Sequence, residues 1–307
     1  MDTALHSQLS PSVTIVGHVC IDQNRTVEDL TDEHRIDNGA GTSATVDAGD
    51  TGSSAGSPAV YMAPQFSRNG VDDVYVLAPY SDDFLGLGAG LHFLNPPQPG
   101  RTMLYRNIIE GGLRRQECYL SETAKSVPLN DVVADRLAST DILVVAPLLP
   151  TLTADYIRQV TAAAPSHAVT ILIAQGYLRD VTDESVVVKR AFIEHADILP
   201  QFDLVVFSDE DISDALVVAR NWSGLYPQVR FVVTQNSAGA TVFCAGMPTH
   251  VAAHPIDTVG QAIGAGDVFS AALSFSYFRG GDAVDAVAEA NSAAAEFIVR
   301  SAARAAV

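Results

Sequence analysis

The stretch Gly264-Ala265-Gly266-Asp267 opens a run of helix formers and bulky apolar residues that continues to Arg279. Gly280-Gly281 then ends the pattern, as a helix C-terminus does. Two small glycines and one acid therefore stand at the start of a predicted buried helix. The first turn of a helix has N–H groups without an intrahelical partner and lies at the positive end of the dipole. Glycines let a phosphate approach these N–H groups closely.

Asp267 is poorly explained as a phosphate ligand, because like charges repel. It is well explained as a base that takes a proton from a hydroxyl group attacking the phosphate. The alternative is an acidic first-turn residue that only complements the helix dipole. The tetrapeptide alone leaves both interpretations open.

Composition restricts the class of protein. The chain has 307 residues, of which 48% are hydrophobic, and can bury one large core. Its net charge of −18 argues against binding to nucleic acid or to an anionic membrane. No apolar run approaches a membrane span, residues 1–11 do not follow a signal-peptide pattern, and the three cysteines match no zinc spacing. We therefore expect a cytoplasmic protein.

Apolar strand patterns alternate with helical patterns from about residue 128 onward. This alternation predicts βαβ units and a parallel sheet, that is, an α/β fold. An apolar run also begins at Val13, and we interpret residues 13–22 as a buried first strand. Ligands of such sheets bind at the carboxyl ends of strands, where Asp22 would lie. The alternative for Asp22 is a surface turn. The further predicted strands are 74–77, 141–147, 169–174, 202–207, 230–234 and 240–244, and the further predicted helices are 153–164, 209–220 and 286–300.

The Gly-Ala-Gly-Asp segment before a long apolar helix resembles the second signature of the ribokinase/PfkB family of sugar and nucleoside kinases. Weaker matches follow the family's order between Val13 and Val299. The resemblance implies a single domain over residues 1–307, a ribokinase-like three-layer α/β/α sandwich with a mostly parallel central sheet and a small β lid. The lid segments would be approximately 25–55 and 101–120. The second of these also carries a hairpin signal around Gly111-Gly112.

By this resemblance, Asp267 is the catalytic base, and the backbone of Gly264, Ala265 and Gly266 forms the anion hole for the transferring γ-phosphoryl group of ATP. An Asp at the offset of Asp22 accepts hydrogen bonds from substrate hydroxyls in the family.

The family's first signature has a Gly-Gly pair and an Asn that contacts the substrate. Here Gly56 matches the first Gly, Ser57 stands in place of the second, and Tyr61 stands in place of the Asn. We therefore assign Asp22, Gly56 and Tyr61 to substrate binding, and Tyr61 suggests a different substrate or pose. Ser81 likewise replaces a Gly of the turn that follows the next strand.

The resemblance also implies residues for the nucleotide and for Mg²⁺. Thr234, Gly239 and Asn291 match positions beside the phosphates, ribose and adenine of ATP. Ser208 and Asp211 replace the Asn and Glu that organise Mg²⁺ and phosphates through water. A helix N-cap explains the Ser208-to-Asp211 segment equally well, and an exposed helix Asn explains Asn291.

The family binds an activating monovalent cation just before the anion hole. This chain has Gln261, Ala262 and Ile263 there, and Ile263 has no side-chain oxygen. We therefore predict weak or absent activation by K⁺.

Together these features predict an ATP-dependent kinase of a small polyol, either a sugar or a cyclitol. The segments 17–22 and 175–179 resemble the inositol-kinase branch slightly more than ribokinase. Two alternatives stay open: a nucleoside kinase of the same family, and a catalytically impaired kinase-like protein that binds a ligand. The lid often forms a homodimer in the family, so a homodimer is possible here, and the polar composition of residues 37–58 leaves the oligomeric state open.

Overall fold

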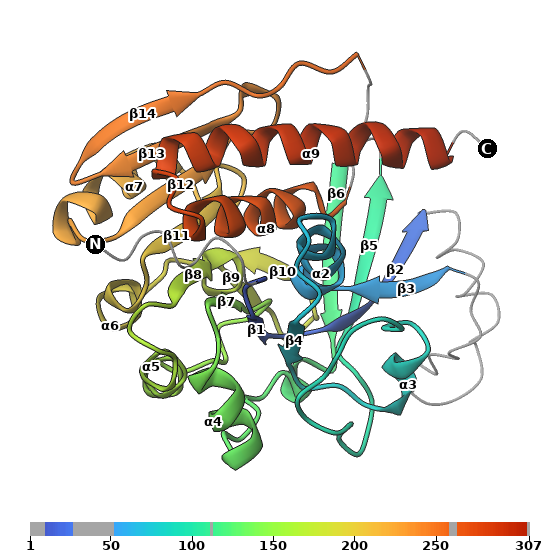
Figure 1. The fold of residues 1–307 in the computed structure, drawn as a ribbon. Coiled ribbons are helices and arrows are strands. Elements are labelled where there is room, and N and C mark those ends of the chain that lie inside the picture. The colour runs from blue at the N-terminus through green and yellow to red at the C-terminus, as the bar shows by residue number, and fades with distance from the viewer. Residues whose placement is uncertain (1–9, 27–51, 111–112, 258–262, 306–307) are drawn as a thin grey trace.

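The computed structural model describes residues 10–26, 52–110, 113–257 and 263–305. Within them, an eight-stranded sheet forms the centre of the protein (Figure 1). Six neighbouring strands run parallel, and two further strands continue one edge in antiparallel pairing. In spatial order the strands are β14 (Met247–Val251), β13 (Ala240–Cys244), β12 (Arg230–Thr234), β11 (Leu204–Ser208), β8 (Val169–Ile173), β7 (Ile142–Ala146), β1 (Val13–Gly17) and β4 (Val74–Leu77).

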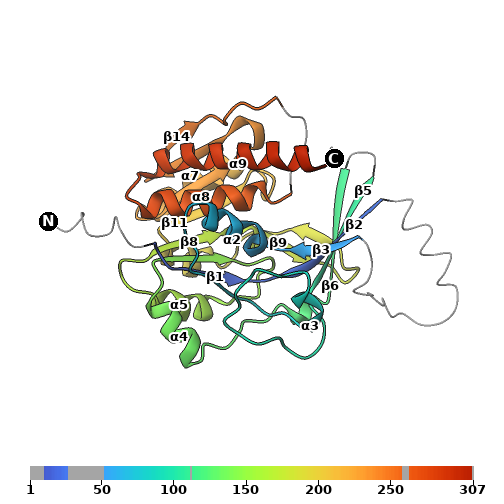
Figure 2. The same ribbon diagram turned by 45° about the vertical axis from the view of Figure 1, so that its right-hand side comes forward.

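Helices cover both faces of this sheet, which confirms the predicted three-layer α/β/α sandwich (Figures 1 and 2). One apolar cluster joins the sheet to α2 (Pro58–Arg68), α8 (Ala265–Phe278) and α9 (Ala283–Ala305). A second cluster, on the opposite face, joins it to α4 (Asp131–Ala138), α5 (Ala154–Ala163) and α7 (Ala215–Leu225). The short helices are α3 (Asp82–Leu85), α6 (His195–Ile198), η1 (Ser121–Thr123), η2 (Ala174–Leu178), η3 (Leu199–Gln201) and η4 (Asn236–Ala238).

The apolar sequences explain these layers. Every residue of β1 and β7 is buried, as expected for parallel strands covered on both faces. Helix α8 packs against β7 and β8 on one side and against α9 on the other. Because both sides are covered, α8 is apolar over most of its circumference, and Val268 to Ser274 are all buried.

A second, four-stranded sheet stands beside the sandwich, and we call it the lid sheet (Figure 1). The predicted hairpin within 101–120 is present as its last two strands. Of the predicted segment 25–55, residues 27–51 lie outside the described residues. A separate short hairpin, β9 (Arg179–Val181) and β10 (Val187–Lys189), contacts the last lid strand. In spatial order the lid strands are β3 (Ser53–Gly56), β2 (Cys20–Thr26), β5 (Leu104–Glu110) and β6 (Leu113–Tyr119).

The prediction of one strand over residues 13–22 is wrong. Strand β1 ends at Gly17, and the chain enters lid strand β2 at Cys20. A methyl group at Gly17 would overlap the backbone of Ala146, so the chain passes very close to β7 at this joint. Asp22 therefore belongs to the lid sheet.

His18 fixes the joint between the two sheets. Its buried ring accepts a hydrogen bond at Nδ1 from the Leu148 amide at 3.0 Å, and its Nε2 lies 3.0 Å from the Thr151 hydroxyl. Burial lowers the pKa of His18 to about 4, so the imidazole is neutral near pH 7.

The predicted helix over 209–220 is also misplaced. Residues 209–214 form turns and bends, Asp214 takes a left-handed conformation at φ 55°, and α7 begins only at Ala215. Strand β14 and the β9–β10 hairpin were not predicted. None of the helices in the described ranges combines the length and the apolar composition needed to cross a bilayer.

Candidate active site

The candidate site lies at the edge where the parallel strands end. Strand β8 leads through η2 to Arg179, and β11 leads to Asp211. These two residues and Asp22 all interact electrostatically with Asp267, on the first turn of α8. The fold therefore brings together side chains from the lid sheet, from the segments that follow two core strands, and from α8.

Asp267 is a half-buried carboxyl group with a displaced pKa. The pKa of Asp267 is raised from its ordinary 3.8 to about 7, mainly by removal from water and to a smaller extent by the negative charges of Asp22 and Asp211. The guanidinium of Arg179 opposes this shift. A pKa near 7 suits a general base that works at neutral pH.

The turn before Asp267 has the shape of an anion-binding helix start. Gly264 has a φ of 91°, which glycine adopts readily, and its carbonyl accepts hydrogen bonds from the Asp267 and Val268 amides at 3.1 and 2.9 Å. The Ala265 and Gly266 amides have no acceptor within the helix. A methyl group added at Gly266 would meet no atom within 4 Å, so this side of the turn is open.

The three predicted substrate residues lie around this turn. A methyl group at Gly56 would overlap the Asp22 carboxylate, so the carboxylate lies directly over the Gly56 backbone. A methyl group at Gly264 would overlap the Tyr61 ring. Asp22 is further held by the Cys20 thiol, whose Sγ lies 3.6 Å from Oδ1.

Asp211 is buried and its two oxygens have different partners. Oδ2 accepts a hydrogen bond from the Ser208 amide at 2.9 Å. Oδ1 accepts from Gln175 Nε2 at 3.2 Å and from Arg179 Nη2 at 3.5 Å. The alternative of a helix N-cap is wrong for this segment, because α7 begins only at Ala215. Asp211 instead ties the end of β11 to the segment that follows β8.

Arg179 and Gln175 lie beside Asp211 in the candidate site, and the sequence did not lead to their assignment. Their signal was polar residues immediately after a buried strand, at the edge where ligands bind. Arg179 brings the positive charge that an acidic chain needs beside a phosphate, and its side chain is 19% exposed.

The three predicted nucleotide residues also lie at this edge. Thr234 ends β12, and its carbonyl accepts a hydrogen bond from the Asp209 amide at 3.0 Å. Gly239 has a φ of 102°, and a methyl group there would overlap the backbone of Val251 to Ala253. The Asn291 side chain donates to the Val251 and Ala252 carbonyls at 3.3 and 3.0 Å. Gly239 and Asn291 thus both contact the segment 251–253. Asn291 is buried, so the alternative of an exposed helix Asn is wrong.

Mg²⁺ fits the site only through phosphates and water. In the described part of the chain no group of three His, Cys, Asp or Glu side chains could hold a metal ion. Both Asp211 oxygens already accept hydrogen bonds, but a carboxylate has further lone pairs that can accept from a metal-bound water.

The prediction about K⁺ rests partly on Gln261 and Ala262, which lie outside the described residues. Ile263, the third residue of that prediction, is 46% exposed.

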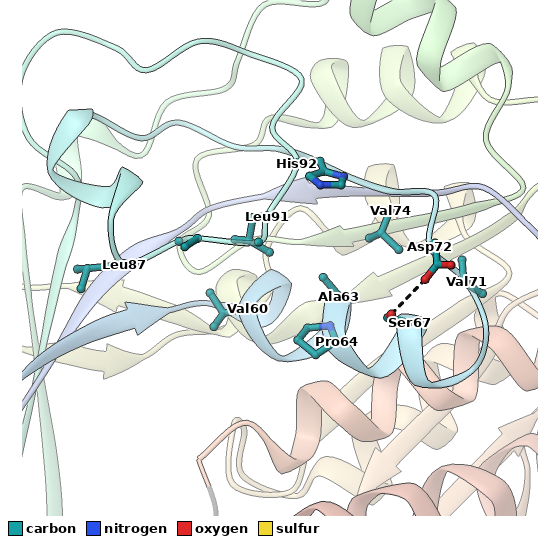
Figure 3. Close-up of a pocket in the computed structure, with 13 residues that line it drawn as sticks. Val60, Ala63, Pro64, Ser67, Val71, Asp72, Val74, Leu87, Leu91 and His92 are labelled. Atoms are coloured by element: carbon teal, nitrogen blue, oxygen red, sulfur yellow. Dashed lines mark hydrogen bonds between the residues drawn. The ribbon is translucent and has the colours of Figure 1, made fainter.

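Two other hollows in the described part of the chain do not include these residues. One, of 410 Å³, lies between α2 and residues 87–92 and is lined mainly by apolar side chains such as Val60, Leu87 and Leu91 (Figure 3). Ser67 and Asp72 are hydrogen-bonded to each other at its rim, at 3.2 Å (Figure 3). This groove faces a different side of α2 from Tyr61 and is no part of the candidate site.

The fold is shared with several kinases of known structure, at low sequence identity. A pyrophosphate-dependent kinase in the ribokinase family, complexed with a pyrophosphate analog and myo-inositol, is 17% identical, with a TM-score of 0.69 over 94% of this chain and 95% of that chain. Adenosine kinase from Sinorhizobium meliloti is 18% identical, with a TM-score of 0.68 over 97% and 100%. Arabidopsis thaliana ribokinase, complexed with ribose and ATP, is 14% identical, with a TM-score of 0.68 over 95% and 93%.

A comparison with curated protein sequences found no match. Residues 93–307, which include Arg179, Asp211 and Asp267, match the pfkB family carbohydrate kinases. This match covers most of the chain and agrees with the ribokinase-type fold. The chain therefore belongs to the pfkB family of carbohydrate kinases.

Proposed function

We propose that this kinase transfers the γ-phosphoryl group of ATP to a hydroxyl group of a small polyol, a sugar or a cyclitol, with Asp267 as the general base. One observation carries the proposal: a carboxyl group with a pKa of about 7 stands on the first turn of α8, beside an open glycine and the charge of Arg179. A purely dipole-complementing acid would not need an elevated pKa.

In the proposed reaction, the acceptor hydroxyl oxygen bonds to the γ-phosphorus as the bond to the bridging oxygen of ADP breaks. The hydroxyl proton passes to Asp267, and ADP leaves. The Ala265 and Gly266 amides and Arg179 stabilise the charge on the transferring group. Such a transition state needs positioning and charge stabilisation more than covalent chemistry.

Mg²⁺ would neutralise part of the phosphate charge when bound with ATP. Asp211 would contact it through water, in keeping with the hydrogen bonds that already hold its two oxygens. The contact of Asp211 Oδ1 with Arg179 Nη2 would help to hold the guanidinium near Asp267. Thr234, Gly239 and Asn291 would line the nucleotide beside the end of β14.

A row of amide side chains on the lid sheet favours a polyol over a nucleoside. Asn24, Asn107 and Gln116 are paired across β2, β5 and β6, on the same face as Asp22 two residues earlier. Gln116 Nε2 donates to Asn107 Oδ1 at 2.9 Å, and Asn107 Nδ2 donates to Asn24 Oδ1 at 3.2 Å. Amides and a carboxylate bind hydroxyl groups, whereas a nucleobase is better covered by aromatic or apolar side chains.

The test is ADP release from ATP across pentoses, hexoses, inositols and nucleosides. We expect turnover with a sugar or an inositol and little with nucleosides. Asp267→Asn is the matched control for contaminating kinases. Turnover with nucleosides alone would show that the acceptor is a nucleoside and not a sugar or a cyclitol. ATP binding by calorimetry without transfer to any acceptor would instead indicate the catalytically impaired binding protein.

A further inference from the structure

Ser57 has a backbone conformation that residues with a Cβ atom rarely adopt. Its φ is 135° and its ψ is 162°, a region populated almost only by glycine. Pro58 follows it, and a residue before proline is normally held at negative φ. Ser57 is therefore strained in φ, at the point where β3 leads into α2 (Figure 1).

The Ser57 side chain is also unusual. It is 7% exposed, and its buried Oγ has no hydrogen-bond partner among the described residues. Serine is a favoured helix N-cap, yet Ser57 makes no side-chain cap bond to α2. Buried hydroxyl groups are nearly always paired, because an unpaired one loses its bonds to water without replacement. Strain and an unpaired hydroxyl thus coincide at one residue.

The position of Ser57 connects the two parts of the candidate acceptor site. The preceding residue, Gly56, lies directly under the Asp22 carboxylate. One turn further along α2, Tyr61 lies against Gly264 in the turn that leads to Asp267. Ser57 therefore stands between the carboxylate proposed to hold the acceptor and the turn proposed to hold the phosphoryl group.

We propose that Ser57 is a specificity-determining residue whose hydroxyl hydrogen-bonds a hydroxyl group of the acceptor. The inference rests on the proposed function, because it concerns the same acceptor. Asp22 can only accept hydrogen bonds when ionised, whereas a serine hydroxyl both donates and accepts. Rotation about one bond moves Oγ among three staggered positions, so it can turn from its buried position to an entering ligand. The pair suits an acceptor with two neighbouring hydroxyl groups.

Two substitutions separate the hydroxyl from the strain. Ser57→Ala removes the hydroxyl and keeps the Cβ at positive φ, whereas Ser57→Gly removes both. Each variant is titrated calorimetrically with myo-inositol, D-ribose and adenosine, and separately with ATP. For the probe that wild type binds, we expect at least tenfold weaker binding by both variants and unchanged ATP affinity. Ser57→Gly should also melt at a higher temperature than Ser57→Ala, because glycine adopts this φ without strain.

Ser81→Ala is the matched control, since Ser81 is another buried N-cap serine without a side-chain cap bond, at an ordinary φ of −123°. It should bind the probe as wild type does. A deoxy derivative of the probe that lacks the contacted hydroxyl should bind wild type and Ser57→Ala equally.

Three results would overturn the assignment. Probe binding within twofold of wild type in both variants would show that the hydroxyl makes no contact. Weakened binding by Ser57→Gly alone would assign the effect to the backbone. If wild type binds none of the three probes, the proposed acceptor site fails and the role of Ser57 fails with it. The first two results leave the proposed kinase reaction standing.

Discussion

The ring of Tyr61 covers the backbone of Gly264, so closely that no Cβ atom could be added there. The same ring meets Phe297 of α9 edge-on, with centroids 6.1 Å apart and an interplanar angle of 84°. Helices α2, α8 and α9 therefore meet at the turn that precedes Asp267. The shape of the proposed anion hole depends on packing between three helices as well as on its own sequence.

Gly264→Ala should damage both the fold and the activity. Alanine is strained at a φ of 91°, and its methyl group would collide with Tyr61. We expect a melting temperature lower by roughly 5 °C or more and a kcat at least tenfold lower. Thermal unfolding and steady-state kinetics measure the two effects. A variant with wild-type stability and activity would contradict this account of the turn.

Gly266→Ala should separate activity from stability. A methyl group there meets no protein atom within 4 Å and lies within α8, where alanine is favoured over glycine by about 0.8–1 kcal/mol. We expect an equal or higher melting temperature and a raised KM for ATP, because the methyl group would occupy space that a phosphate needs. Unchanged ATP kinetics would remove Gly266 from the anion hole.

The rate should depend on the ionisation of Asp267. We expect kcat/KM for the acceptor to rise with pH and level off above an apparent pKa of about 7, since only the carboxylate accepts the proton. Asp267→Asn should lower kcat by about 10²- to 10⁴-fold. A pH-independent rate between pH 5 and 9, or an unchanged rate in the variant, would exclude Asp267 as the base.

The same group should affect stability with a defined sign. The Asp267 carboxyl binds its proton more tightly in the folded protein, with a pKa of about 7, than at its ordinary 3.8. Its ionisation therefore destabilises the fold progressively as pH rises from about 4 to 7. Asp267→Asn removes this effect, so its gain in melting temperature over wild type should be larger at pH 8 than at pH 5. Equal gains at both pH values would argue against the raised pKa.

Arg179→Gln should move the pH profile. Arg179 lowers the pKa of Asp267, so removal of its charge should shift the acid limb of kcat/KM to higher pH and reduce kcat. Arg158→Gln is the matched control, because Arg158 pairs with Asp155 on the exposed surface of α5. An acid limb at the same pH in both variants would separate Arg179 from the base.

The sequence predicted helix α8 better than the surroundings of its first turn. Helix α8 begins at Ala265 as predicted, because glycines and apolar spacing are local signals. The electrostatic interaction of Arg179 with Asp267 joins segments far apart in the chain. The position of Arg179 soon after a buried strand places it near the sheet edge but does not reveal its partner. The strained φ of Ser57 was not predicted either, although the resemblance places Ser57 at a position where the family has a glycine.

The hydrophobic pattern of the sequence was not sufficient to predict the ends of the strands and helices around the candidate site. The apolar run from Val13 to Ile21 continues through Gly17 and His18, so its pattern does not reveal that the chain changes sheets there. Asp22 was predicted at the carboxyl end of the first strand, whereas it lies within lid strand β2 and interacts electrostatically with Asp267 from there. The start of α7 was missed because the acidic residues 209–211 look like a helix first turn, whereas Asp211 bonds back to Ser208.

The neutral ring of His18 has a practical consequence for measurements on this kinase. When the activity of an enzyme changes with pH near neutrality, the change is commonly assigned to a histidine. His18 lies only four residues before Asp22. Its proton affinity, however, is too low for it to change charge above about pH 5. At the joint between the core sheet and the lid sheet, His18 therefore keeps a constant charge above about pH 5, and a kinetic midpoint near pH 7 would not come from this ring.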